Sequence, residues 1–84
     1  MLDMKIAKVL QIAQKNGYVT NKNCRELGIR SPTFYFLIWS LRDNGIVKIM
    51  DLDERRQNMW KLTEKGEKIT KHITEIIKLM ENKI

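Results

Sequence analysis

The residue types that most often carry out catalysis or hold metals are scarce in this chain of 84 residues. Cys24 and His72 are its only cysteine and its only histidine. One cysteine cannot form an intramolecular disulfide, and this pair cannot supply the usual four ligands of a structural zinc site. No nucleophile has a histidine at hand, no glycine-rich loop could hold a phosphate, and the acids do not converge on a pocket. We therefore expect no enzyme activity, no metal and no cofactor.

The charged residues point instead to binding. Sixteen lysines and arginines against ten aspartates and glutamates give a net charge of +6. An excess of this sign favours an anionic partner such as a nucleic acid. Because the excess is spread along the chain without a basic tail, any nucleic-acid-binding surface must be formed by folding.

The length and hydropathy of the chain limit its organisation. Two separate cores would each be too small to be stable without disulfides or metals, so residues 1–84 are predicted to form a single domain. The longest apolar run, Phe34–Trp39, has six residues, which is too short for a membrane span or a signal peptide. We expect a cytoplasmic protein with no membrane partner.

Two helices are predicted in the N-terminal part of the chain. The first carries one apolar stripe at helical spacing and ends at Gly17. Thr20 is the predicted N-cap of a second helix of two turns, which would carry Cys24 and Leu27 inward. Gly28 then breaks this helix, and the buried thiol is expected to be inert. The stripe of the first helix is Leu2, Ile6, Val9, Leu10 and Ala13.

The third helix has clearer signals at both ends. Ser31 is predicted to cap it, Pro32 suits its first turn, and the pair Asn44-Gly45 stops it. Its predicted inward face consists of Phe34, Leu37, Ile38 and Leu41.

The second half of the chain predicts a hairpin and a last helix. Residues 46–51 form a short segment rich in β-branched residues, which predicts a strand. The polar run 53–58 then reverses the chain into a second strand at residues 59–62. Thr63 and the acids that follow it open the last helix, in which Gly66 is a weak spot. The predicted fold class is mainly α with a small β-hairpin, in the order helix, helix, helix, strand, strand, helix.

Several segments, in this order, resemble those of one kind of DNA-binding protein. A helix-turn-helix is suggested by Asn21–Leu41, where Cys24-Arg25-Glu26-Leu27-Gly28-Ile29 leads through Arg30-Ser31-Pro32-Thr33 into the third helix. The connection to a wing is suggested by Leu41-Arg42-Asp43-Asn44-Gly45-Ile46-Val47. The wing tip is suggested by Asp53-Glu54-Arg55-Arg56, and the junction with the last helix by Leu62-Thr63-Glu64-Lys65-Gly66. Together, roughly residues 5–70 resemble winged-helix regulators of the multiple-antibiotic-resistance regulator (MarR) and PadR-like families. The resemblance implies a winged helix-turn-helix fold. Because family members are usually longer, with extra helices that shape an effector pocket, no small-molecule effector is expected here.

The residues themselves favour the third helix as the DNA reader. A major groove about 12 Å wide admits one α-helix, whose outward face can then meet base edges. The wing arginines are expected to contact phosphates or the minor groove, with a solvated turn as the alternative. The predicted DNA-binding residues are Lys22, Arg30, Ser31, Thr33, Tyr35, Phe36, Trp39, Ser40, Arg42, Arg55 and Arg56.

The outward face of the third helix is aromatic and lacks the polar base readers Arg, Asn and Gln at its centre. Three interpretations of Phe36 and Trp39 stay open: contact with thymine methyls and sugars, a protein-binding patch, or packing against the wing and a dimer partner. Tyr35 could instead donate its hydroxyl to a phosphate.

The last helix, residues 64–84, is predicted to form a homodimer. Its apolar stripe is wider than one small core can cover, although it could also pack on the first helix of its own chain. The predicted dimer residues are Leu2, Ile69, Ile73, Ile76, Ile77 and Met80.

The sequence therefore predicts a homodimeric transcriptional regulator that binds double-stranded DNA in a specific or semi-specific manner. A winged-helix module for protein–protein interaction is the alternative.

Overall fold

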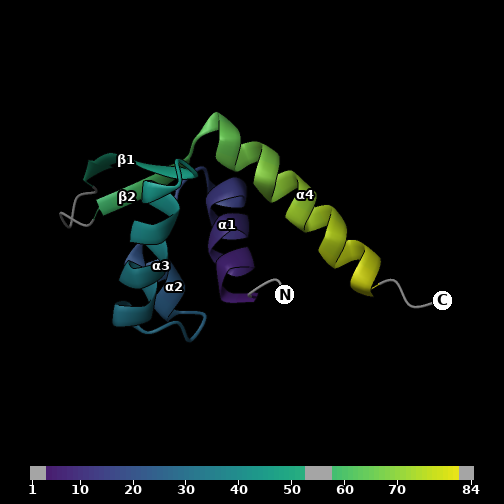
Figure 1. Cartoon of the computed structure of the whole chain (residues 1–84). Coiled ribbons are helices and arrows are strands. Elements are labelled where there is room, and N and C mark those ends of the chain that lie inside the picture. The colour runs from purple at the N-terminus through teal and green to yellow at the C-terminus, as the bar shows by residue number, and fades with distance from the viewer. Residues whose placement is uncertain (1–3, 53–57, 82–84) are drawn as a thin grey trace.

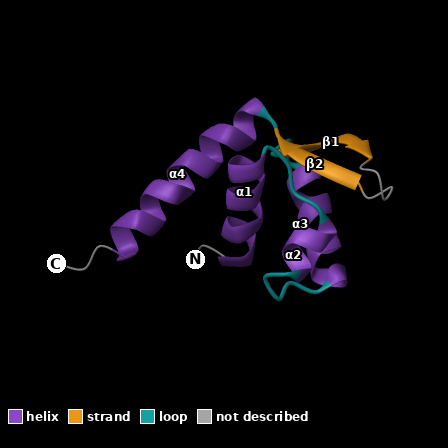
Figure 2. Cartoon of the chain, turned by 180° about the vertical axis from the view of Figure 1, so that it is seen from behind, coloured by secondary structure: helices purple, strands orange, loops and turns teal. Residues whose placement is uncertain are grey.

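The computed structural model describes residues 4–52 and 58–81 of the chain. It confirms the predicted order of three helices, a two-stranded antiparallel hairpin and a C-terminal helix (Figures 1 and 2). The elements are α1 (Met4–Asn16), α2 (Asn21–Arg25), α3 (Ser31–Asp43), β1 (Val47–Leu52), β2 (Asn58–Leu62) and α4 (Glu64–Glu81). This order and pairing are those of a winged-helix-like fold.

The predicted inward faces of α1 and α3 form the centre of the core. Phe34 and Ile38 of α3 are fully buried, as are Val9 and Leu10 of α1. Ala7, which no stripe predicted, is also buried, so α1 contributes a wider face to the core than its large residues suggest. Leu2 lies outside the described residues.

The hairpin is joined to the helical part by a short backbone bridge. Val47 pairs with Leu62 and Lys48 with Lys61, and the register shifts between Ile49 and Leu52. Val19, in the connection between α1 and α2, exchanges two backbone hydrogen bonds of 2.8 and 3.0 Å with Trp60. Trp60 is buried, so the base of the hairpin is fixed to the core.

The second helix is shorter than predicted. The Thr20 hydroxyl accepts from the Asn23 amide, and the Asn23 side chain accepts from the Thr20 amide, so the predicted N-cap is confirmed. The helix ends at Arg25, however, and Leu27 lies in the following turn with 48% of its surface exposed. The prediction that Leu27 points inward is therefore wrong, and Ile29 is buried in its place.

The sequence predicts Ser31 as the N-cap of α3, but the N-cap in the structure is Arg30. The Ser31 hydroxyl accepts a hydrogen bond of 2.9 Å from the Asn21 side-chain amide, which ties the start of α3 to the start of α2. Arg30 supplies no side-chain cap, and Pro32 lies in the first turn. At its other end α3 stops at Asn44-Gly45 as predicted, with Gly45 at φ +71°.

Gly66 is a close-contact point and not a weak spot in α4. A Cβ atom at this position would stand 2.0 Å from the carbonyl oxygen of Ile46. Beside it, the Thr63 hydroxyl accepts from the Gly66 amide at 3.0 Å and donates to the Gly45 carbonyl oxygen at 2.5 Å, with the Ile46 carbonyl oxygen at 3.2 Å. The first turn of α4 is thus held directly against the segment that joins α3 to β1.

Candidate nucleic-acid interface

The outward face of α3 is formed by three exposed rings, which we call the aromatic stripe: Tyr35, Phe36 and Trp39. Their exposed fractions are 36%, 73% and 51%. The ring centroids of Tyr35 and Trp39 lie 5.7 Å apart, so these two rings form one surface. The expected orientation of α3 is confirmed, because Phe34, Leu37, Ile38 and Leu41 are all buried on its opposite side.

The N-terminal end of α3 is basic and faces a hollow. Arg25, Arg30 and Ser31 line this hollow together with the turn that contains Gly28; its volume is about 400 Å³. Both arginines are exposed, and Gly28 has φ +82°, a conformation that L side chains rarely adopt. Because no side chain caps α3 here, the positive end of its dipole is left for solvent or an anion, although Pro32 in the first turn has no amide hydrogen to donate.

The other predicted DNA-binding residues of α2 and α3 differ in how accessible they are. Some face solvent, and one is bonded to a neighbouring side chain. Lys22 and Ser40 are exposed, and Thr33 is half-buried. The Arg42 guanidinium donates from Nε and Nη2 to one carboxylate oxygen of Asp43 at 3.1 and 3.0 Å. Arg42 is thus partly neutralised by its neighbour, whereas the basic end near Arg25 and Arg30 has no such acid among the described ion pairs.

The hairpin adds two lysines that sequence reasoning missed. Lys48 and Lys61 stand directly opposite each other across the two strands. Like charges in this position destabilise a sheet, which an anionic partner would relieve. If Val47 is placed opposite Leu62 in an antiparallel hairpin, the next pair in the register is Lys48 opposite Lys61, so the sequence could have predicted this pair. Arg55 and Arg56 lie outside the described residues.

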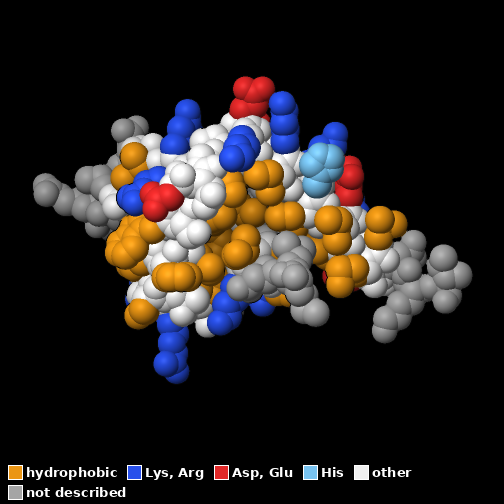
Figure 3. Space-filling model, viewed as in Figure 1, with side chains coloured by type: hydrophobic (Ala, Val, Ile, Leu, Met, Phe, Trp, Pro, Cys, Tyr) orange, Lys and Arg blue, Asp and Glu red, His pale blue; other side chains and the backbone are white. Residues whose placement is uncertain are grey.

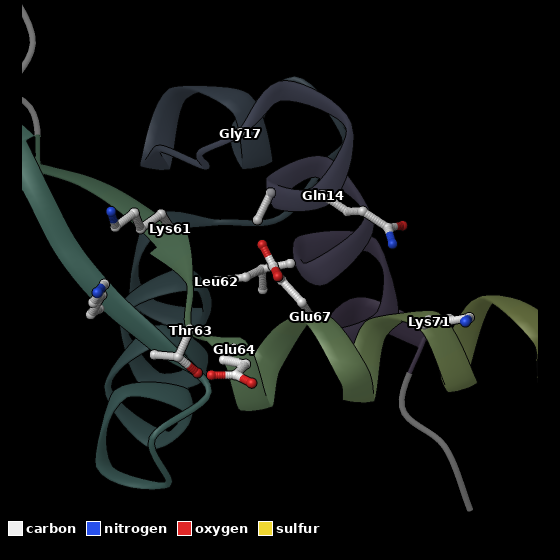
Figure 4. A pocket seen from close by; sticks show the side chains of 10 residues that line it. Gln14, Gly17, Lys61, Leu62, Thr63, Glu64, Glu67 and Lys71 are labelled. Atoms are coloured by element: carbon white, nitrogen blue, oxygen red, sulfur yellow. The ribbon is translucent and has the colours of Figure 1, made fainter.

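A second hollow, of about 530 Å³, lies between the end of α1, the hairpin and the start of α4. Figure 4 shows Glu67 pointing into it from α4, whereas Lys61 and Lys71 point away. The side chains around it do not converge as a catalytic set would.

The lone thiol is buried and has little tendency to ionise. Cys24 has no exposed surface, and this burial raises the pKa of its thiol to about 11. His72 is exposed on α4, with its Nδ1 atom 3.9 Å from a Glu75 carboxylate oxygen. Within residues 4–52 and 58–81, no group of three or more His, Cys, Asp or Glu side chains could hold a metal ion.

The predicted dimer residues on α4 divide into two sets. Ile73 and Ile77 are buried in the chain's own core, and Ile69 packs against that core. Ile76 and Met80 remain exposed at 47% and 68%, together with Leu79 at 75%, which had not been singled out. The surface left for a partner is therefore the C-terminal part of α4, which diverges from α1 (Figure 1).

Comparison of the chain with protein families, with characterised proteins and with solved structures finds no match. None of the described helices is long and apolar enough to cross a membrane.

Proposed function

We propose that this chain is a transcriptional regulator that binds duplex DNA as a homodimer, in the manner of the MarR and PadR-like regulators that its sequence resembles. The first turn of α3 enters the major groove, and the wing lies at the minor groove. The winged-helix-like topology and the net charge of +6 support this proposal.

The observation that carries the proposal is the basic end of α3. In helix-turn-helix proteins the N-terminal residues of the second helix meet the DNA, and free amides at a helix start bind phosphate. Here α3 begins without a side-chain cap, and Arg25 and Arg30 stand beside that start. Two cations and a helix dipole then act on the same anion.

The exposed apolar end of α4 supports the homodimer. Ile76, Leu79 and Met80 form an apolar surface on a helix that otherwise carries many charges. A two-fold dimer would present two α3 helices about 34 Å apart, one turn of B-DNA, and would favour a pseudo-palindromic site.

Replacement of Arg30 tests the proposal. Arg30→Ala should weaken binding to a duplex of mixed sequence and reduce the slope of log affinity against log salt by about 0.9. Lys78→Ala is the matched control, because it removes the same charge from an exposed position on α4. Equal effects of the two substitutions, measured by fluorescence anisotropy of labelled duplex, would refute the proposed docking of α3.

The exposure of the aromatic stripe favours a second candidate, a protein-interaction module. An exposed aromatic cluster is a common anchor in protein interfaces. The double substitution of Phe36 and Trp39 by alanine separates the candidates. Loss of sequence-specific duplex binding, with salt-dependent binding retained, supports a reader of DNA; unchanged duplex affinity supports the protein module.

A further inference from the structure

The third helix has an apolar face on both of its sides, which is unusual for a helix at the surface of a small domain. Phe34, Leu37, Ile38 and Leu41 fill the core, and the aromatic stripe lies opposite them. An exposed cluster of large apolar side chains on a small domain marks an interaction surface. The stripe is therefore a surface that lacks its partner.

The charges around the stripe indicate what kind of partner fits. Arg30 precedes α3 and Arg42 lies in its last turn, about 18 Å apart at 1.5 Å per residue. The only carboxylate of the helix is Asp43, and it is bonded to Arg42. An apolar surface that has at its start Arg30, a cation without an ion pair among the described residues, on a chain of net charge +6, is complementary to a polyanion that also carries flat apolar groups.

Duplex DNA offers such groups poorly. Its bases are stacked, so the major groove presents polar edges and, at thymine, a methyl group. Unpaired bases expose their faces, and proteins bind them by stacking them on aromatic side chains beside basic residues. The three rings, two of them in mutual contact, provide that kind of surface.

We propose that the aromatic stripe binds the unpaired bases of a single-stranded nucleic acid, while Arg30 at the start of α3 contacts its phosphates. This activity goes beyond duplex binding and shares with it only the anionic partner. Figure 3 shows hydrophobic side chains at the surface over the α3 region. Because single strand and duplex use α3, they should compete for it.

Tryptophan fluorescence gives a direct test, because Trp39 is exposed and Trp60 is buried. In a Trp60→Phe background, a short oligothymidylate should quench the Trp39 emission, since a stacked base quenches indole. An abasic strand of the same length and charge should bind at least tenfold more weakly and leave the emission unchanged. This comparison needs no change in the stripe; the unmodified chain supplies the two affinities by anisotropy of labelled strands.

Substitutions then locate the contact. Phe36→Ala should weaken oligothymidylate binding about tenfold, the lower part of the range for one lost base stack, and leave the affinity for the abasic strand unchanged. Met4→Ala is the control, because it removes a large exposed apolar side chain from another helix, α1. Equal affinity for the two strands, or no quenching, would overturn the inference.

The same titrations separate this inference from the proposed function. Duplex binding without base-dependent binding of the single strand would overturn the inference and leave the regulator proposal standing. Base-dependent binding of the single strand without duplex binding would do the reverse. Preference of the stripe for an acidic, apolar peptide over the oligothymidylate would overturn the inference in favour of the protein module.

Discussion

At the scale of single residues, a few polar side chains decide how the helices meet. Thr63 bonds the first turn of α4 to the segment after α3, and Asn21 bonds the start of α2 to that of α3. The sequence predicted the Thr20 cap, because local spacing suffices for such a motif. It missed the partner of Ser31, because the Asn21 amide reaches that hydroxyl from ten residues away.

The buried thiol gives a prediction at this scale. Burial raises the pKa of Cys24 from 9.0 to about 11, so at neutral pH the folded chain should alkylate with iodoacetamide at least about tenfold more slowly than the urea-unfolded chain. The unfolded thiol ionises first as the pH rises. The stability that Cys24 contributes is therefore complete below pH 9.0 and is lost as the pH rises towards 11. Equal alkylation rates in the two states would contradict the buried placement of Cys24.

At the scale of elements, the periodic segments were predictable and the close contacts were not. The inward stripe of α3 and the hairpin followed from apolar spacing and β-branched residues, and both are confirmed. The sequence overestimates the length of α2. Leu27 has the spacing of an inward-facing helical residue, but it lies in the turn that follows the end of the helix at Arg25. The basic hollow also depends on that turn, so neither its position nor its lining followed from the sequence.

Gly66 provides the test at this scale. In an exposed helix, Gly→Ala stabilises by roughly 1 kcal/mol, but here the new Cβ would collide with the backbone of Ile46. Gly66→Ala should therefore lower the free energy of unfolding by about 1–3 kcal/mol, measured by urea denaturation. Lys71→Ala, at an exposed position of the same helix, should change it by less than about 0.5 kcal/mol. A Gly66→Ala variant as stable as the parent would show that α4 does not approach Ile46 so closely.

At the scale of the whole molecule, the basic end of α3 and the exposed apolar end of α4 lie apart from each other. The helical part with the basic end of α3 lies on one side of α1, and the exposed end of α4 extends on the other (Figure 2). Composition predicted the net charge, but the cross-strand lysine pair required the hairpin register. The stripe of α4 was predicted as a dimer surface; part of it belongs to the chain's own core, which only the packing of α1 on α4 reveals.

The homodimer is tested at its exposed surface. Replacing both Leu79 and Met80 by aspartate should convert a dimer into a monomer, because two charges would be buried in an apolar contact. The fold should persist, since both side chains are exposed in the single chain. Lys78→Ala should remain dimeric. Sedimentation of the intact chain as a monomer at micromolar concentration would refute the dimer.

The central claim, binding of duplex DNA through the basic end of α3 and its neighbours, is tested most directly by a salt titration. Gel-shift or anisotropy measurements with a duplex of mixed sequence should give a linear fall of log affinity with log salt. With Lys22, Arg25 and Arg30 each on a phosphate, the slope should be about −2.7 per protomer, from about −0.9 per contact. Absence of duplex binding at low salt, or an affinity independent of salt, would contradict the claim.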